Sequence, residues 1–170
     1  MPEKIKLRFA ILVDSPLLKK WQADSIQYVV DTKHAEFVGF IQNIGSTKPS
    51  AKSVSVGFRS LYKNIDRNGP LQLTEWEKQF PTTPKFSFTP EQKGVANYFN
   101  KSDLETFKSL ELDVVLRFGF GILKGEVLNI PTYGIWSFHH GNPRKYRGGP
   151  AAFWEIFKIL FLKLSSGKVA

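Results

Sequence analysis

The chain has 170 residues, of which 42% are hydrophobic and 14% aromatic. This apolar fraction is enough for one buried core, and the length fits one domain spanning residues 1–170. Charged residues make up 23%, close to the globular norm of about 25%, which excludes wholesale disorder. The absence of cysteine excludes disulfide scaffolds, thiolate zinc sites, iron–sulfur clusters and cysteine nucleophiles.

The N-terminal apolar run covers only residues 9–13 and ends at Asp14, so it is too short for the core of a signal peptide. No stretch approaches the roughly 18 uncharged apolar residues that span a bilayer. We therefore expect a soluble, cytoplasmic protein with no membrane partner.

The net charge of +9 favours an anionic partner, because basic side chains release counterions from phosphates. The lysines and arginines, however, are scattered singly and in pairs such as Lys19-Lys20 and Arg144-Lys145. The favoured interpretation is a solvated basic surface that also attracts an anionic small molecule. Direct nucleic-acid binding stays an alternative that is not favoured.

Residues 6–13 form a short apolar run typical of a buried strand, and residues 36–44 form a second one. Between them, an approximately helical apolar stripe predicts a helix over residues 17–32. A strand, a helix and a strand in this order favour a right-handed βαβ unit in a parallel sheet.

The remaining elements are expected in the following order along the chain. A loop at 45–53 and a short helix at 58–65 come first, followed by an irregular stretch at 76–99 with one strand at 85–88. A helix then runs from the capping box at 102–105 to residue 110, and a strand at 113–118 and a helical turn at 123–128 follow it. The last elements are a strand at 134–138, a loop at 141–150 and an apolar helix at 151–164. The sequence therefore predicts an α/β fold with a mostly parallel sheet flanked by helices.

His139 and His140 follow a predicted strand and precede a glycine-rich loop. Ligands of open α/β sheets bind at the carboxyl ends of strands, so one of these histidines is a candidate site residue. The alternative is a histidine that only makes a structural hydrogen bond. No metal site is predicted, since His34 is the only other histidine and no HxH or HExxH spacing occurs.

Gly119-Phe120-Gly121 resembles a phosphate-binding GxG, but no third glycine and no Gly-Lys-Ser/Thr follow it. A dinucleotide site or a P-loop is therefore only weakly supported. The structural interpretation is a tight strand-to-helix turn in which glycine adopts positive φ. Such a turn also exposes backbone N–H and C=O groups to a flat heterocycle.

Residues 113–154, DVVLRFGFGILKGEVLNIPTYGIWSFHHGNPRKYRGGPAAFW, resemble the formyltransferase family that uses 10-formyltetrahydrofolate. That family includes methionyl-tRNA formyltransferase, glycinamide ribonucleotide formyltransferase and sugar N-formyltransferases. The resemblance is strongest over residues 113–156, and residues 157–170 depart from the family pattern. It implies a Rossmann-like formyltransferase fold and transfer of a formyl group from 10-formyltetrahydrofolate to a primary amine, such as an amino-sugar nucleotide or another small acceptor.

The resemblance also implies roles for individual residues. His139 stands at the catalytic histidine, and Ser137 stands where the family has an asparagine. The segment that contacts the pterin corresponds to Phe120, Gly121, Ile122 and Leu123. The loop that borders the substrate corresponds to Tyr146, Arg147 and Gly148.

The family's catalytic aspartate lies roughly 35 residues beyond its histidine, a position that this sequence, ending at Ala170, does not reach. The sequence is therefore expected to be a truncated formyltransferase-like domain. A binding or interaction module of the same fold, impaired in catalysis, is the alternative to an active enzyme.

Overall fold

The computed structural model describes residues 6–45, 69–70 and 72–138. The chain forms two compact units, Met1–Trp136 and Ser137–Ala170. Of the second unit, only Ser137 and Phe138 are among the described residues. The predicted helices at 58–65 and 151–164 and the predicted loop at 141–150 lie outside them, as does most of the loop at 45–53.

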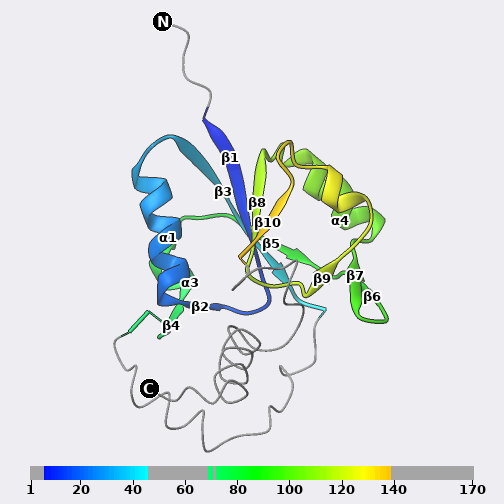
Figure 1. The fold of residues 1–170 in the computed structure, drawn as a ribbon, viewed down its shortest axis with the longest axis horizontal. Helices are drawn as coiled ribbons and strands as arrows, with labels where there is room; N and C mark the ends of the chain where they lie inside the picture. Colours follow the sequence, from blue (N-terminus) through cyan, green and yellow to red (C-terminus); the bar gives the residue numbers. More distant parts are fainter. Residues whose placement is uncertain (1–5, 46–68, 71, 139–170) are drawn as a thin grey trace, which may run out of the picture. The chain divides into compact units, whose positions relative to one another are not determined.

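A five-stranded parallel sheet organises the first unit, in the strand order β10-β8-β1-β3-β5 (Figure 1). Its strands are β1 (Leu7–Val13), β3 (Ala35–Asn43), β5 (Lys85–Phe88), β8 (Val114–Arg117) and β10 (Ile135–Ser137). In the centre, β1 pairs with β3 from Leu7↔Ala35 onward and with β8 from Phe9↔Val114 onward. The predicted α/β class with a mostly parallel sheet is confirmed.

The alternating side chains of β1 face two separate hydrophobic cores. Ala10 and Leu12 pack in one core with Phe107 of α4 (Lys101–Ser109). Phe9, Ile11 and Val13 pack in the other, with side chains of α1 (Lys20–Asp31). Since the side chains of a strand point alternately to opposite faces, α1 and α4 cover opposite faces of the sheet, as Figure 1 shows. The full burial of residues 9–13 of β1 explains why they appear in the sequence as a continuous apolar run.

The second core contains a stack of two large rings. Trp76, in α3 (Trp76–Gln79), lies with its ring centroid 4.1 Å from that of Phe40, and both side chains are fully buried. The Trp76 indole N–H donates to the backbone oxygen of Ser15 at 2.9 Å. This packing joins the segment after β1 to the region around residue 76.

The predicted helix at 17–32 begins three residues late. Residues Leu17–Lys19 form strand β2 instead, which pairs antiparallel with β4 (Leu73–Glu75). Leu18 is buried there, at 2% exposure. This pairing partner lies more than fifty residues away, so the local apolar periodicity could not indicate it.

In the stretch at 76–99, which was expected to be irregular apart from one strand, the strand at Lys85–Phe88 is confirmed. The rest of the expectation is wrong, because Trp76–Gln79 form α3 and the residues after Phe88 form further strands. There, β6 (Glu91–Lys93) and β7 (Ala96–Tyr98) form a hairpin, and β9 (Ile122–Leu123) pairs parallel with β7. Strands of two or three residues are too short for an alternation pattern, which explains the error.

The helix predicted to end near residue 110 is confirmed, but its cap is different. Asn100 is the N-cap of α4, and its side-chain oxygen accepts the backbone N–H of Asp103 at 2.8 Å. The capping box expected at residue 102 therefore lies inside the helix. The predicted turn at 123–128 is the 3₁₀ helix η1 (Glu126–Asn129), preceded by β9.

Candidate functional site at the carboxyl edge of the sheet

The strand order places a topological switch point between β1 and β8. From β1 the chain continues to β3 and β5 on one side, whereas β8 and β10 lie on the other side. In open α/β sheets, ligands bind in the crevice beyond the carboxyl ends of the strands at such a point. The residues directly after β1 and β8 are therefore the first place to look for a site.

Asp14 follows β1, and Gly119-Phe120-Gly121 follows β8 by one residue. The backbone N–H of Phe120 donates to Asp14 Oδ1 at 2.7 Å. A Cβ atom on Gly119 would lie only 2.5 Å from the backbone nitrogen of Asp14. Glycine is thus required at residue 119 because the two chain segments approach each other so closely.

Asn43, the last residue of β3, joins the same group. Its side-chain Nδ2 donates to Asp14 Oδ1 at 3.4 Å, and its Oδ1 accepts the backbone N–H of Gly45 at 3.0 Å. Asn43 is only 6% exposed, so its amide is largely shielded from water and held by these partners. The carboxyl ends of three neighbouring strands are therefore connected through one carboxylate oxygen.

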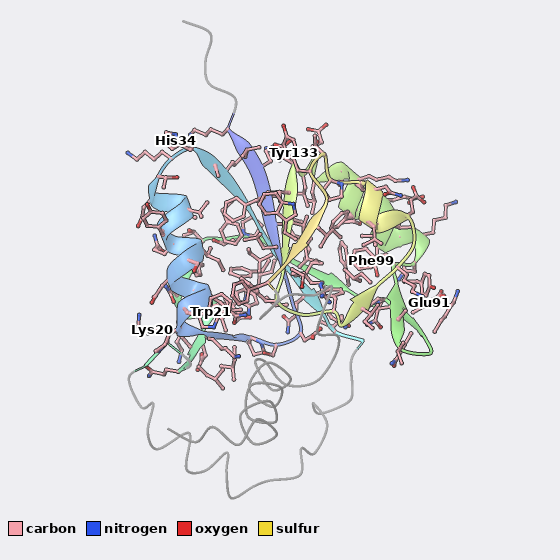
Figure 2. All side chains as sticks on the ribbon, in the orientation of Figure 1. Lys20, Trp21, His34, Glu91, Phe99 and Tyr133 are labelled. Atoms are coloured by element: carbon pink, nitrogen blue, oxygen red, sulfur yellow. The ribbon has the colours of Figure 1, made fainter. Side chains whose placement is uncertain are left out.

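The turn itself has a left-handed backbone. Phe120 has φ +65° and Gly121 has φ +52°. For Phe120 this conformation costs about 1–2 kcal/mol, whereas burial of a phenylalanine ring contributes about 1.5–3 kcal/mol. Its ring is fully buried and lies 5.6 Å from that of Phe99, which Figure 2 labels. Core packing thus offsets the backbone strain.

The turn leads into strand β9, so the prediction that it connects a strand to a helix is wrong. A dinucleotide site needs a helix N-terminus directly after its glycine-rich turn. The N-terminus of α1 does not offer its first two amides to a phosphate either, because both already donate within the protein. The Lys20 N–H donates to Gln72 O at 2.7 Å, and the Trp21 N–H donates to Pro70 O at 3.0 Å. The described carboxyl edge therefore has no dinucleotide-type phosphate site.

The four residues predicted to contact a pterin differ in exposure. The Phe120 and Leu123 side chains are buried, whereas Ile122 is 52% exposed. Gly121 lies between them with an exposed backbone. β9 is an edge strand of the order β6-β7-β9, so within the described residues no strand pairs with its side away from β7.

Of the other predicted site residues, Ser137 is the last residue of β10 and is exposed. It belongs to the second unit, so the structure does not relate it to the turn at residues 119–121. The remaining four lie outside the described residues: His139, Tyr146, Arg147 and Gly148.

Asp14, Asn43 and Asn97 were not identified from the sequence. The sequence held a signal for the first two. Asp14 follows the predicted strand at 6–13, Asn43 is the next-to-last residue of the predicted strand at 36–44, and polar residues near the carboxyl ends of strands lie at the ligand-binding edge. Asn97 had no signal, since its Nδ2 donates to the carbonyl oxygen of Phe120, 23 residues away, at 2.8 Å.

At the carboxyl end of β5, a second carboxylate, which unlike that of Asp14 is buried, has a structural role. Asp103 Oδ2 accepts the backbone N–H of Thr89 and the side-chain amide of Asn100, both at 3.0 Å. Burial raises the pKa of Asp103, and the hydrogen bond from Thr89 lowers it by a smaller amount. These bonds join the residue after β5 to the N-terminal cap of α4, so we interpret Asp103 as a structural residue.

The described residues contain as many Asp and Glu as Lys and Arg. The net positive charge of the chain therefore belongs to residues 46–68 and 139–170. The nucleic-acid alternative depends on those residues. Within the described ranges, no group of three or more potential ligand side chains could hold a metal ion, and no helix is long and apolar enough to cross a membrane.

The described part of the chain is a mixed α/β protein with a parallel sheet, a polar switch point and a left-handed turn beyond its central strands. No model of a known protein family matches the sequence, and no curated protein matches it significantly.

Proposed function

We propose that this chain is a folate-dependent formyltransferase domain of Rossmann-like formyltransferase fold, which transfers a formyl group from 10-formyltetrahydrofolate to a primary amine. The observation that supports this best is the turn at residues 119–121, which lies at the switch point and leads into an edge strand rather than a helix. A backbone edge that no described strand pairs with offers N–H and C=O groups to the amide-like edge of a flat pterin. This geometry agrees with the resemblance of residues 113–156 to the family.

In this proposal, the backbone of Phe120, Gly121, Ile122 and Leu123 borders the pterin. The acceptor amine attacks the formyl carbon, and the carbonyl oxygen becomes an oxyanion. His139 stabilises that oxyanion and acts as the acid and base of the reaction. The bond between the formyl carbon and N10 then breaks, N10 takes a proton, and the products are tetrahydrofolate and a formamide. Tyr146, Arg147 and Gly148 border the acceptor.

A binding module of the same fold is the second candidate, and Ser137 is the observation that favours it. A preorganised donor to an oxyanion contributes about 3–4 kcal/mol to a transition state. The serine hydroxyl donates one hydrogen bond from a shorter side chain than the family's asparagine. A chain that binds the folate with this reduced donor set would transfer formyl slowly or not at all.

Thermal unfolding of the full chain with 5-formyltetrahydrofolate tests the folate site. At about 100 times its dissociation constant, the ligand adds about 2.7 kcal/mol to the free energy of unfolding. For a domain of this size, we expect Tm to rise by about 5–11 °C. An unchanged Tm at saturating concentrations would overturn the proposed folate site.

Formyl transfer to a panel of primary amines, including amino-sugar nucleotides, then separates the two candidates. We expect His139→Ala to abolish transfer and to keep the ligand-induced rise in Tm. His140→Ala is the matched control, because it removes the neighbouring imidazole, and it should retain transfer. Binding without transfer by the unmodified chain would favour the binding module, and equal activity of His139→Ala would contradict the catalytic assignment.

A further inference from the structure

The carboxylate of Asp14 connects parts of the chain that are distant in sequence. Its Oδ1 accepts the backbone N–H of Phe120, 106 residues away, at 2.7 Å. The same oxygen accepts Asn43 Nδ2 at 3.4 Å. A carboxylate acceptor makes such bonds shorter and stronger than a neutral acceptor does.

The bond from Phe120 acts on the turn and not on the pairing of β1 with β8. The pairing of β1 with β8 covers Phe9↔Val114 to Leu12↔Arg117, and the backbone N–H of Phe118 still donates to Leu12 O at 2.9 Å. Asp14 lies beyond this ladder and is itself exposed. Its side chain therefore adds nothing to the strand pairing, and its removal opens no cavity in either core.

The backbone at residue 120 needs this partner. A non-glycine residue rarely keeps a φ of +65° unless its surroundings hold it there. The Phe120 ring is anchored in the core, and its carbonyl is held by Asn97 at 2.8 Å. The bond to Asp14 holds the remaining polar group, the N–H. Together the two bonds fix the backbone of Phe120 and therefore the direction in which the Phe120–Gly121 peptide, with the Gly121 N–H, points.

We propose that Asp14 is the positioning residue of the folate site: its carboxylate fixes the left-handed turn at Phe120, so that the backbone of Gly121 and Ile122 is preorganised for the pterin. This inference rests on the proposed function. A preorganised site loses less conformational freedom when it binds, and the gain appears directly as affinity.

The test compares Asp14→Ala and Asp14→Asn with the unmodified 170-residue chain. Asp24→Asn is the matched control: it also removes one carboxylate, which pairs with Lys20 at 2.6 Å on the exposed side of α1. Three quantities are measured: Tm without ligand, hydrogen exchange of the Phe120 amide by NMR, and the Kd for 5-formyltetrahydrofolate.

For Asp14→Ala we expect exchange of the Phe120 amide to become about tenfold faster or more, while the Val115 amide keeps its protection. The Kd should rise by about tenfold or more, the effect of losing a hydrogen bond to a charged group. Asp14→Asn should lose less, because its amide oxygen still accepts the Phe120 N–H. Asp24→Asn should match the unmodified chain in both quantities.

The two ways of failing are distinguishable. If the unmodified chain binds the folate and Asp14→Ala binds it equally well, the positioning role is overturned and the proposed function stands. If the unmodified chain does not bind the folate, the proposed function is overturned, and the positioning role in that site falls with it. A general loss of Tm and of Val115 protection in Asp14→Ala would also overturn it, in favour of a purely structural role.

Discussion

Asn97 and Phe120 connect the small second sheet to the turn beyond the large one. Asn97, in β7, donates from its side-chain Nδ2 to the carbonyl oxygen of Phe120 at 2.8 Å. Its own backbone oxygen accepts the N–H of Lys124 at 3.1 Å, directly after β9. The two contacts enclose residues 120–124, so the hairpin of β6 and β7 supports the segment that we assign to the pterin.

We therefore expect Asn97→Ala to lower the free energy of unfolding by about 1–3 kcal/mol, because it leaves the Phe120 carbonyl without its side-chain donor. Urea unfolding measures the change. Asn129→Ala, at an exposed position in η1, is the control and should stay within about 0.5 kcal/mol of the unmodified chain. Equal stability of the two variants would show that the Asn97 bond is replaced by water at no cost.

Gly119 and Gly94 allow steric contact to be separated from backbone strain. A Cβ at residue 119 would meet the backbone of Asp14 at 2.5 Å and that of Val13 at 2.7 Å. At Gly94, with φ +63°, a Cβ would meet nothing within 4 Å. We expect Gly94→Ala to cost about 1–2 kcal/mol from strain alone and Gly119→Ala to cost more, about 3 kcal/mol, since backbone must move.

Denaturant midpoints of the two glycine variants check this order. Gly119→Ala should also weaken binding of 5-formyltetrahydrofolate, whereas Gly94→Ala should not. A Gly119→Ala protein as stable as Gly94→Ala would mean that the segments after β1 and β8 can separate easily.

Asp103 should make stability depend on pH. Because burial raises the pKa of this carboxyl in the folded protein, the unfolded chain loses the proton at lower pH than the folded protein does. Ionisation therefore favours unfolding. The contribution of Asp103 is fully present below the ordinary pKa of an aspartate and is lost as the pH rises through the raised value.

The measurement compares the unmodified chain with Asp103→Asn by urea unfolding between about pH 3 and pH 7. The asparagine keeps an oxygen for the Thr89 N–H but cannot ionise. We expect the unmodified chain to lose stability relative to Asp103→Asn as the pH rises. Glu105→Gln, on the exposed side of the same helix, is the control, and a difference with the opposite sign would contradict the role of burial.

A substitution of Ser137 is expected to raise the rate of formyl transfer rather than lower it. On the proposed mechanism, Ser137→Asn supplies the longer donor that the family has, and we expect formyl transfer to become about tenfold faster or more. Ser137→Ala removes the hydroxyl and should slow transfer. Both variants should bind 5-formyltetrahydrofolate as the unmodified chain does, and identical rates for the three proteins would exclude Ser137 from the mechanism.

The longer elements were predictable because their burial leaves a local pattern. In the strand at Leu7–Val13, residues 9–13 form an unbroken apolar run because both faces of the strand are covered there, and the strand at Ala35–Asn43 has buried apolar residues at its centre. The strand at Lys85–Phe88 was also predicted, with the same bounds as in the structure. The glycines at 119 and 121 indicated a tight turn, which the structure contains.

The site's supporting contacts were not predictable, because they depend on residues distant in sequence. Leu17–Lys19 became a strand only because Leu73–Glu75 lies beside it, and the turn at residue 119 led into a strand because β7 was there to pair with β9.

The sequence by itself determined the class of fold, through hydrophobic periodicity, and the segment that resembles a formyltransferase. Only the tertiary structure decided that Asp14 meets Phe120. Hydrogen bonds across 106 residues leave no periodic trace in a sequence, because either partner alone is compatible with many environments.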